Sequence, residues 1–391
     1  MTSADIVIAG AGPAGIAAAF RASASKNVVV IDDNPAAGGQ VWRGMARTPW
    51  AAPNAVFRFN RRIISADAVR RSLLLEDGEI RYGKLIIATG ARELFLPFPG
   101  WTLPNVFGAG GIQALVKCGL PVKGKKIVVA GTGPLLLAVA AYLKKQGAIV
   151  PIIAEQAPFR KVFPFALRKT IRALALRASL IGVRYATGCW VEAAEGDHQV
   201  RRLRLRDGVK TWSQECDYLA VGYGLCPNTE LASLLGCGAV DDFQQTSVAD
   251  VYCAGEVMGI GGVDLSITEG QIAGYAASDQ TEAARALFPQ RRRAQQFAAA
   301  LNKAFKLRPE LQALPHGNTI VCRCEDVTFA RLQATASWRE AKLQTRLGMG
   351  PCQGRVCGPA TQFLFGWQPE SVRPPIFPAR IASFLEEGTT K

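Results

Sequence analysis

The sequence of 391 residues contains no apolar run as long as the ~20 residues that a membrane-spanning helix requires. Its first residues, MTSADIVIAG, lack the basic start, the apolar stretch and the small-residue cleavage site of a secretory signal. We therefore expect a cytoplasmic protein. Hydrophobic residues make up 49% of the chain and charged residues 20%, which excludes a disordered protein and indicates folded cores. At about 150 residues per domain, the length allows two or three domains.

Histidine is nearly absent, because only His198 and His316 occur. Both lie in polar segments that we expect to form surface loops, so neither is a candidate catalytic acid or base. The ten cysteines include no Cys-x-x-Cys pair, and in a cytoplasmic chain they do not predict a disulfide framework. Six of them stand alone in apolar surroundings and are expected to be small core residues: Cys118, Cys189, Cys216, Cys226, Cys237 and Cys253.

Acidic residues are few relative to basic ones, since 46 Lys and Arg face 31 Asp and Glu, a net charge of +15. The basic residues are scattered in short runs, which usually form solvated faces. We expect no helix that interleaves a basic stripe with aromatic residues, and hence no nucleic acid as a partner. The excess of positive charge fits docking on an acidic subunit or on an anionic membrane surface.

The N-terminus carries a glycine-rich turn between a predicted strand and a predicted helix. Residues 5–9, DIVIA, are followed by Gly10, Gly12 and Gly15 in the order G-A-G-P-A-G, and a second predicted strand ends on Asp32. Gly10 permits the tight turn, Gly12 lets a pyrophosphate approach the helix N-terminus, and Gly15 lets the helix pack on the sheet. The Asp32 carboxylate is placed to accept hydrogen bonds from a ribose. The pattern predicts a dinucleotide site, without separating FAD from NAD.

A second unit of the same kind begins after residue 126. The run IVVA leads into Gly131-Thr-Gly133-Pro-Leu-Leu136, and the next predicted strand ends on Glu155. Leu136 replaces the third glycine, and Pro151 interrupts the second strand by removing a ladder N–H. Glu155 still offers a ribose acceptor. An active NAD(P)H site, a site for an unreacted adenine nucleotide and a mere scaffold all remain open.

Three further segments carry a resemblance to two-dinucleotide-domain flavoproteins of the pyridine nucleotide–disulfide oxidoreductase type. These are Gly38-Gly39-Gln40, the segment Leu85 to Gly90, and Ala249 to Glu256. Where that family usually has Asp, this chain has Glu256. The resemblance implies FAD as the cofactor, with a helix near residues 268–271 directed at the flavin. The implied FAD contacts are Gly10, Gly12, Pro13, Ala14, Gly15, Asp32, Gly39, Gln40, Arg43, Ala88, Thr89, Gly90, Gly255 and Glu256.

Disulfide reductases of this type carry a cysteine pair against the flavin, and neither flavin-side segment of this chain contains one. The chain therefore shows no machinery for substrate chemistry beyond the flavin itself.

Four cysteines are clustered near the C-terminus as Cys322-x-Cys324 and Cys352-x4-Cys357. Residues 326–336 and 338–348 predict two short helices between the pairs. Glycines around the second pair let backbone amides approach the sulfurs. Four free thiols, a structural zinc site and a [2Fe–2S] cluster are the alternatives; zinc ribbons favour two to four residues within each pair, so Cys-x-Cys is unusual for zinc.

The segments CRCEDV and TRLGMGPCQGRVCGP resemble the bacterioferritin-associated-ferredoxin-type [2Fe–2S] domain. This implies a cluster held by Cys322, Cys324, Cys352 and Cys357. The whole layout, including GTGPLLLA, resembles the FAD-containing subunit of heteromeric opine oxidases, hydroxyproline dehydrogenases and hydrogen cyanide synthases. In such complexes a separate β subunit of the D-amino-acid-oxidase type oxidises the C–N bond.

The resemblance implies an oxidoreductase subunit that relays electrons from the β subunit to a respiratory acceptor. It also allows a small third subunit, FMN at a subunit interface, an unreacted adenine nucleotide in the second domain, and peripheral contact with the inner face of the membrane. The other functions left open are a self-sufficient NAD(P)H:acceptor oxidoreductase and a non-catalytic assembly subunit with a structural zinc.

We therefore predict an α/β fold with two Rossmann-like dinucleotide-binding domains, the second inserted in the first, and a small helical iron–sulfur domain. The predicted division assigns residues 1–103 and 221–290 to FAD binding and 104–220 to the inserted domain. Residues 291–318 are a linker helix, and 319–391 form the cluster domain and tail.

Overall fold

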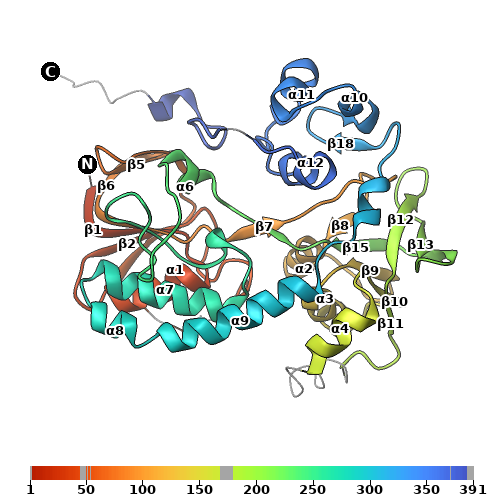
Figure 1. Ribbon diagram of the computed structural model, residues 1–391, viewed down its shortest axis with the longest axis horizontal. Coiled ribbons are helices and arrows are strands. Elements are labelled where there is room, and N and C mark those ends of the chain that lie inside the picture. Colours follow the sequence, from red (N-terminus) through yellow and green to blue (C-terminus); the bar gives the residue numbers. More distant parts are fainter. Residues whose placement is uncertain are drawn as a thin grey trace. The chain divides into compact units, whose positions relative to one another are not determined.

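The computed structural model describes residues 2–44, 50, 52, 54–167, 179–369 and 371–384 (Figure 1). The chain divides into two compact units. The first consists of Met1–Arg92, Cys226–Ala299 and Ser371–Lys391, and the second of Glu93–Leu225 and Ala300–Glu370. The chain leaves the first unit in β7 (Ala91–Glu93) and returns in β16 (Leu225–Pro227). The predicted α/β class is confirmed, because each unit is built on a mostly or wholly parallel sheet with helices packed on it.

The sheet of the first unit has seven strands in the order β3-β2-β1-β6-β5-β4, with β17 paired to β6. The strands β1, β2, β3 and β17 run parallel to their neighbours, whereas β4 and β5 are antiparallel. Fully buried β-branched runs such as Val28–Ile31 explain why these segments form central strands. The bounds are β1 (Thr2–Ala9), β2 (Val28–Ile31), β3 (Ala55–Arg58), β4 (Ile63–Asp67), β5 (Ser72–Leu75), β6 (Gly78–Ile87) and β17 (Val251–Cys253).

Two helices of the first unit, α1 (Pro13–Ala22) and α7 (Val263–Ala277), pack tightly against each other. A Cβ on Gly270 would lie 2.2 Å from the Ala14 carbonyl oxygen, and one on Gly274 would lie 2.5 Å from that of Ala18. Only glycine permits this crossing, which fixes the start of α1 against α7. The other helices are α6 (Glu230–Leu234), η2 (Gly255–Met258), α8 (Thr281–Arg285), η4 (Ile381–Phe384) and α9 (Phe288–Ala304), the last running into the second unit.

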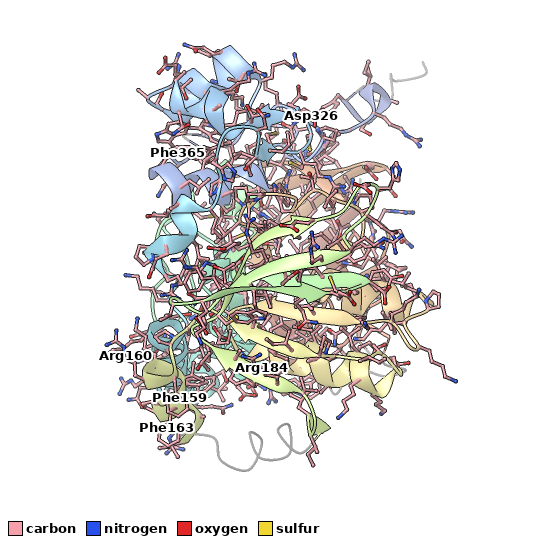
Figure 2. The ribbon with its side chains drawn as sticks, turned by 90° about the vertical axis from the view of Figure 1, so that its right-hand side faces the viewer. Phe159, Arg160, Phe163, Arg184, Asp326 and Phe365 are labelled. Carbon is pink, nitrogen blue, oxygen red and sulfur yellow. The ribbon has the colours of Figure 1, made fainter. Side chains whose placement is uncertain are left out.

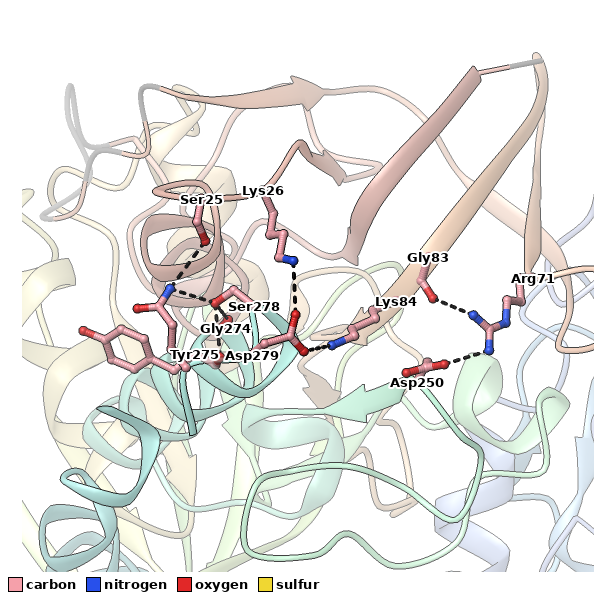
Figure 3. Close-up of polar contacts among 11 residues, drawn as sticks. Ser25, Lys26, Arg71, Gly83, Lys84, Asp250, Gly274, Tyr275, Ser278 and Asp279 are labelled. Carbon is pink, nitrogen blue, oxygen red and sulfur yellow. Dashed lines mark hydrogen bonds and ion pairs between the residues drawn. The ribbon is translucent and has the colours of Figure 1, made fainter. Parts of the chain in front are cut away.

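Exposed ion pairs join distant segments at one edge of the first unit (Figure 3). Asp279 lies 3.1 Å from Lys26 Nζ and 2.5 Å from Lys84 Nζ, and Arg71 lies 2.7 Å from Asp250. Pairs this exposed contribute roughly 0.2–1 kcal/mol each. They secure loops and do not form a site.

The second unit has a parallel five-stranded sheet in the order β11-β10-β9-β15-β8, and an antiparallel sheet β12-β13-β14. Pro151 interrupts the strand before Glu155 as predicted, since β10 begins at Ile152 and only Ile149 bridges to Lys126 before it. The strands are β8 (Val106–Gly108), β9 (Ile127–Gly131), β10 (Ile152–Glu155), β11 (Arg184–Thr187), β12 (Trp190–Glu195), β13 (Arg202–Arg206), β14 (Thr211–Glu215) and β15 (Tyr218–Gly222). The helices are α2 (Ala109–Lys117), α3 (Pro134–Lys145) and α4 (Phe159–Ala166).

The cysteine-bearing part of the second unit has its own small core around Trp338, Leu332 and Leu347. The two predicted helices are present: the first shortened to α10, and the second, α11, capped by Ser337, whose hydroxyl accepts from Glu340 N. The elements are η3 (Pro309–Ala313), β18 (Ile320–Cys322), β19 (Val327–Thr328), α10 (Phe329–Gln333), α11 (Trp338–Thr345) and α12 (Cys357–Phe365).

The segment after residue 370 packs with the first unit, where Ile376 N donates to Ile64 O at 2.8 Å. The division predicted from sequence had kept this tail with the cluster domain. The finer boundaries at residues 103, 221, 291 and 319 stay a prediction.

Helix α4 corrects one expectation, because it does combine aromatic residues with cations: Arg160 and Lys161 stand between Phe159 and Phe163. None of its residues is buried. Among the described residues, no helix is both long and apolar enough to cross a bilayer.

Candidate functional site

Gly10 and Gly15 have the packing roles that the spacing predicted, and the role of Gly12 in approaching a phosphate stays a prediction. Gly10 has φ +107°, and a Cβ on it would lie 2.3 Å from the Ala88 carbonyl oxygen. A Cβ on Gly15 would lie 1.8 Å from the Gly10 carbonyl oxygen, so both positions require glycine for packing. At Gly12 a Cβ would meet no described atom within 4 Å. The start of α1 is therefore open beside Gly12, where its amides and dipole favour an anion.

Asp32, at the end of β2, is held by the turn itself. Its carboxylate accepts from Ala11 N at 2.6 Å and from Asn34 N at 2.7 Å and Asn34 Nδ2 at 2.8 Å. Arg43 Nη2 donates to Asn34 Oδ1 at 2.8 Å, which ties the segment after Gly39 to the same place. A carboxylate has about four lone-pair sites, so capacity for a further hydroxyl donor remains.

Two other segments approach the first turn. A Cβ on Gly39 would lie 3.0 Å from Gly12 Cα, and one on Gly255 would lie 2.7 Å from Ala14 Cβ. Ala88 N donates to Ala9 O at 2.8 Å, which brings the end of β6 to the end of β1. The structure thus gathers most of the predicted contacts around the start of α1. As FAD ligands they remain predictions.

Thr89 and Gly90 are fixed by a residue that sequence reasoning missed. Thr89 Oγ1 donates to Asn228 O at 2.7 Å, Asn228 Nδ2 donates to Thr89 O at 2.9 Å, and Asn228 N donates to Gly90 O at 2.9 Å. The residues lie nearly 140 positions apart, and Cys-Pro-Asn-Thr carries no recognisable motif. No signal in the sequence could have found this pair.

Two further predicted residues are Gln40 and Glu256. Gln40 is exposed, and Glu256 is half-buried in η2, where burial raises its pKa. A second acid, Glu269 of α7, is buried and accepts from Gly255 N at 3.0 Å. Burial raises the pKa of Glu269 to about 7, opposed by the Gly255 amide and by Arg291. Glu269 therefore fixes the Gly255 turn, a role its helical position did not reveal.

The second turn repeats the first turn's hydrogen bonds. The Glu155 carboxylate accepts from the Gly133 amide at 2.7 Å and from the Ala157 amide at 2.8 Å. The Asp32 carboxylate likewise accepts from the amides of Ala11 and Asn34, although Ala11 stands one position earlier in its turn than Gly133 does. Thr132 Oγ1 adds a third bond to Glu155 at 2.8 Å. Glu155 has no exposed surface, and this burial raises its pKa to about 7. A Cβ on Gly133 would meet nothing described within 4 Å, so the phosphate end of this turn is open.

The ribose end of the second turn is covered by residues 305–308, which follow α9 and which we call the strap. Gln156 Nε2 donates to Lys306 O at 3.3 Å and to Thr132 Oγ1 at 2.9 Å, and Arg308 N donates to Gln156 Oε1 at 3.1 Å. Thr132 Oγ1 also lies 3.3 Å from Phe305 O. The acid that a nucleotide ribose would use is therefore enclosed by the chain itself.

The four C-terminal cysteines lie together, and each cysteine of the first sequence pair contacts one of the second. Cys322 and Cys357 are buried and hydrogen-bond each other, and the exposed Cys324 hydrogen-bonds the half-buried Cys352. The Cys357 contact and backbone amides, including that of Gly348, lower the pKa of Cys322 to about 6. The Cys322 contact raises the pKa of Cys357. Among the described residues, however, no group of three or more His, Cys, Asp or Glu side chains has a geometry ready for a metal ion.

Glycine is required where the two cysteine turns meet. A Cβ on Gly350 would lie 2.3 Å from the Cys324 Cβ, and one on Gly348 would lie 2.7 Å from the Trp338 ring. A larger residue at either position would push Cys352 and Cys357 away from Cys322 and Cys324.

The other cysteines only partly follow the expectation of isolated core residues. Cys189, Cys216 and Cys253 are buried, but Cys118 is exposed at the end of α2. The apolar sequence of this helix gave no sign of that exposure. Cys237 is not isolated, because Cys253 hydrogen-bonds it and lowers its pKa to about 7. The expected exposure of the histidines is confirmed for His198 and His316.

Comparison with known proteins gives consistent matches. Residues 4–277 match the family described as pyridine nucleotide-disulphide oxidoreductase. The chain is 30% identical to hydrogen cyanide synthase subunit HcnB of Pseudomonas protegens, over 90% of this chain and 89% of that protein. It is 31% identical to an opine oxidase subunit of Rhizobium meliloti strain 1021, over 90% of each. L-proline dehydrogenase from P. horikoshii shares the fold, with a TM-score of 0.72 at 17% identity over 98% of this chain and 80% of that one.

Proposed function

The chain belongs to the pyridine nucleotide-disulphide oxidoreductase family, and we propose that it is the electron-transferring FAD and [2Fe–2S] subunit of a heteromeric amino-acid or opine dehydrogenase. It is a flavin-family oxidoreductase and a homologue of subunits of opine oxidase and hydrogen cyanide synthase. In the proposal, a partner flavoprotein of the D-amino-acid-oxidase type removes electrons from a C–N bond. This chain passes them to a respiratory acceptor.

The observation that carries the proposal is the contrast between the two dinucleotide turns. In the first, Gly12 faces open space and Asp32 retains a free acceptor site. In the second, Glu155 accepts as many hydrogen bonds as Asp32 does, but it has no exposed surface and the strap covers the ribose end. A chain with one usable turn holds its flavin but has no equivalent site for NAD(P)H. In the proposal, the electrons then arrive from another polypeptide.

The residues of the first turn fit the ADP half of FAD. The amides at the start of α1 would bind the pyrophosphate beside Gly12, and the Asp32 carboxylate would accept from the ribose. Glu269 holds the Gly255 turn in place, and Asn228 holds Thr89 and Gly90. Bound FAD supplies the capacity to take up electrons in pairs and release them singly.

The C-terminal cysteines fit a [2Fe–2S] cluster in the nature and number of their donors. Cys322, Cys324, Cys352 and Cys357 offer four thiolates from two adjoining turns, and amides directed at Cys322 stabilise its anionic form. A bound cluster supplies one-electron transfer. A cluster would have to replace the contacts that Cys322 makes with Cys357 and Cys324 with Cys352.

Partners beyond the amine-oxidising β subunit follow from the resemblance and belong to the same proposal: a small third subunit, FMN at a subunit interface and a membrane-bound acceptor. The relatives are named as subunits, which supports partner polypeptides, whereas FMN and the acceptor rest on the resemblance alone.

Anaerobic stopped-flow mixing of the purified chain with NADH and with NADPH tests the function. We expect no bleaching of the flavin within the turnover time of a dehydrogenase, about 0.1 s at a typical rate of ~10 per second. Dithionite, as the positive control, should bleach it fully. Rapid bleaching by either nucleotide would show a self-sufficient NAD(P)H oxidoreductase and overturn the proposal.

A further inference from the structure

Helix α4 presents a stripe of large apolar side chains that nothing in the described chain covers. Phe159, Phe163 and Leu167 are 63%, 50% and 59% exposed. Their spacing of four residues places them on one side of the helix and its C-cap. The rings of Phe159 and Phe163 stack with centroids 5.2 Å apart, and Figure 2 shows both at the outer end of this part of the molecule beside Arg160. We call these three residues, with Arg160 and Lys161, the α4 face.

The helix itself is fixed to the second unit. Phe165 packs edge-on against Phe305 with ring centroids 5.2 Å apart, and Val162 is half-buried. The inner side of α4 is therefore anchored. The exposed stripe is a built feature of the helix and not a consequence of its detachment.

The charge along the sequence that contains and follows α4 has a single sign. From Gln156 to Val191 the sequence contains no Asp or Glu. The same stretch contains seven cations: Arg160, Lys161, Arg168, Lys169, Arg172, Arg177 and Arg184. An apolar stripe flanked by cations alone is typical of helices that lie in the plane of an anionic bilayer surface.

We propose that the α4 face docks this chain on the surface of an anionic lipid bilayer. Phe159, Phe163 and Leu167 enter the boundary between headgroups and acyl chains, and Arg160 and Lys161 contact lipid phosphates. A lipid surface fits better than a folded protein, because this stretch offers no acidic residue to complement a mixed-charge interface. It also fits better than a nucleic acid, since the rings of Phe159 and Phe163 stack on each other and aliphatic Leu167 offers nothing for bases to stack on.

The inference deepens the proposed function by naming the surface through which the chain would approach a membrane-bound acceptor. Lipid binding needs neither FAD nor a cluster. A failure to bind vesicles would leave the electron relay untouched, and a failure of the relay would leave vesicle binding untouched.

Co-sedimentation of the full chain with vesicles tests the proposal. We expect binding to vesicles that contain phosphatidylglycerol, at least about tenfold weaker binding to pure phosphatidylcholine, and loss of binding at high salt, where surface charges are screened. Phe159→Ser with Phe163→Ser should weaken binding to the anionic vesicles about tenfold or more, and Arg160→Glu with Lys161→Glu should abolish it.

Leu343→Ser is the matched control, because Leu343 is 70% exposed on α11, outside the α4 face. It should leave vesicle binding unchanged, and the melting temperatures of all variants should match that of the wild type. The proposal is wrong if wild type and both α4 variants bind vesicles equally, or if none of them binds. It is also wrong if a single-stranded oligonucleotide binds more tightly than the anionic vesicles and displaces them.

Discussion

The backbone amide of Gly133 donates a 2.7 Å hydrogen bond to the Glu155 carboxylate, as the Ala11 amide does to Asp32 one position earlier in the first turn. Both turns therefore keep the local geometry of a dinucleotide site. The two turns differ in the residues that surround the carboxylate, which is Asp32 in the first turn and Glu155 in the second. Thr132, Gln156 and the strap enclose Glu155, so the second turn now binds part of its own chain.

Two glycine substitutions should separate cofactor binding from folding. Gly12→Val places its side chain in the open space beside α1, where the backbone has an ordinary φ of −76°, so the fold should persist while FAD content falls about tenfold or more. Gly15→Ala instead meets the Gly10 carbonyl oxygen and should destabilise the protein by about 1–3 kcal/mol. Flavin absorbance per chain and thermal unfolding distinguish them. Equal loss of stability in both variants would contradict these roles.

Asp32→Asn should weaken FAD binding about tenfold to a hundredfold. The amide group removes one charged acceptor from the ribose and from Ala11 N, and hydrogen bonds to charged groups contribute about 1.5–3 kcal/mol. The control is Asp33→Asn, because Asp33 is 47% exposed and lies one residue further along. Flavin release followed by fluorescence gives both affinities. A similar loss in the control would show that the general negative charge matters, and not the position of Asp32.

The stability of the second unit should depend on Glu155 between about pH 4.5 and pH 7. Burial raises the folded pKa of Glu155 above its ordinary value of 4.5, so the folded state binds more protons in this window. The free energy of unfolding should therefore fall as the pH rises from about 4.5 to about 7, with Glu269 adding a fall of the same sign in the first unit.

Glu155→Gln removes this titration and should flatten the slope, although it lowers stability overall because three donors face the new amide group. Urea unfolding at a series of pH values measures both effects. An unchanged slope in Glu155→Gln would show that Glu155 does not titrate in this range.

Cysteine substitutions should distinguish the cluster from the other thiols. Cys322→Ser should reduce iron from about two per chain to nearly none, since thiolates are the ligands of such clusters. Cys118→Ser, at an exposed cysteine outside the pairs, should leave the iron unchanged. Iron and zinc are measured together by elemental analysis. Zinc retained at one per chain in the wild type would instead favour a structural metal site.

The sequence predicted local features of the site well, because they depend on nearby residues. The spacing of Gly10, Gly12 and Gly15 reports on a single turn, and the cysteine pairs stand in two short segments. Asn228, Glu269 and the strap escaped prediction. Asn228 acts on Thr89 through a contact far along the chain, and the strap reaches Gln156 from about 150 positions away. Such contacts depend on how the strands and helices pack, which no local pattern encodes.

The second turn shows most clearly what could not be predicted from the sequence. Leu136 and Pro151 indicated a departure from an active nucleotide site, yet Glu155 kept nucleotide binding open. The proposal rests on the enclosure of Glu155 by Gln156 and residues 305–308, which only the folded chain reveals.

The most direct test of the central claim is a stepwise anaerobic reduction of the purified chain, followed by flavin absorbance and by electron paramagnetic resonance. The account predicts one FAD per chain and a paramagnetic signal of a reduced [2Fe–2S] centre, which is lost in Cys322→Ser while the flavin remains. A chain that contains zinc and shows no such signal at any stage of reduction would contradict it.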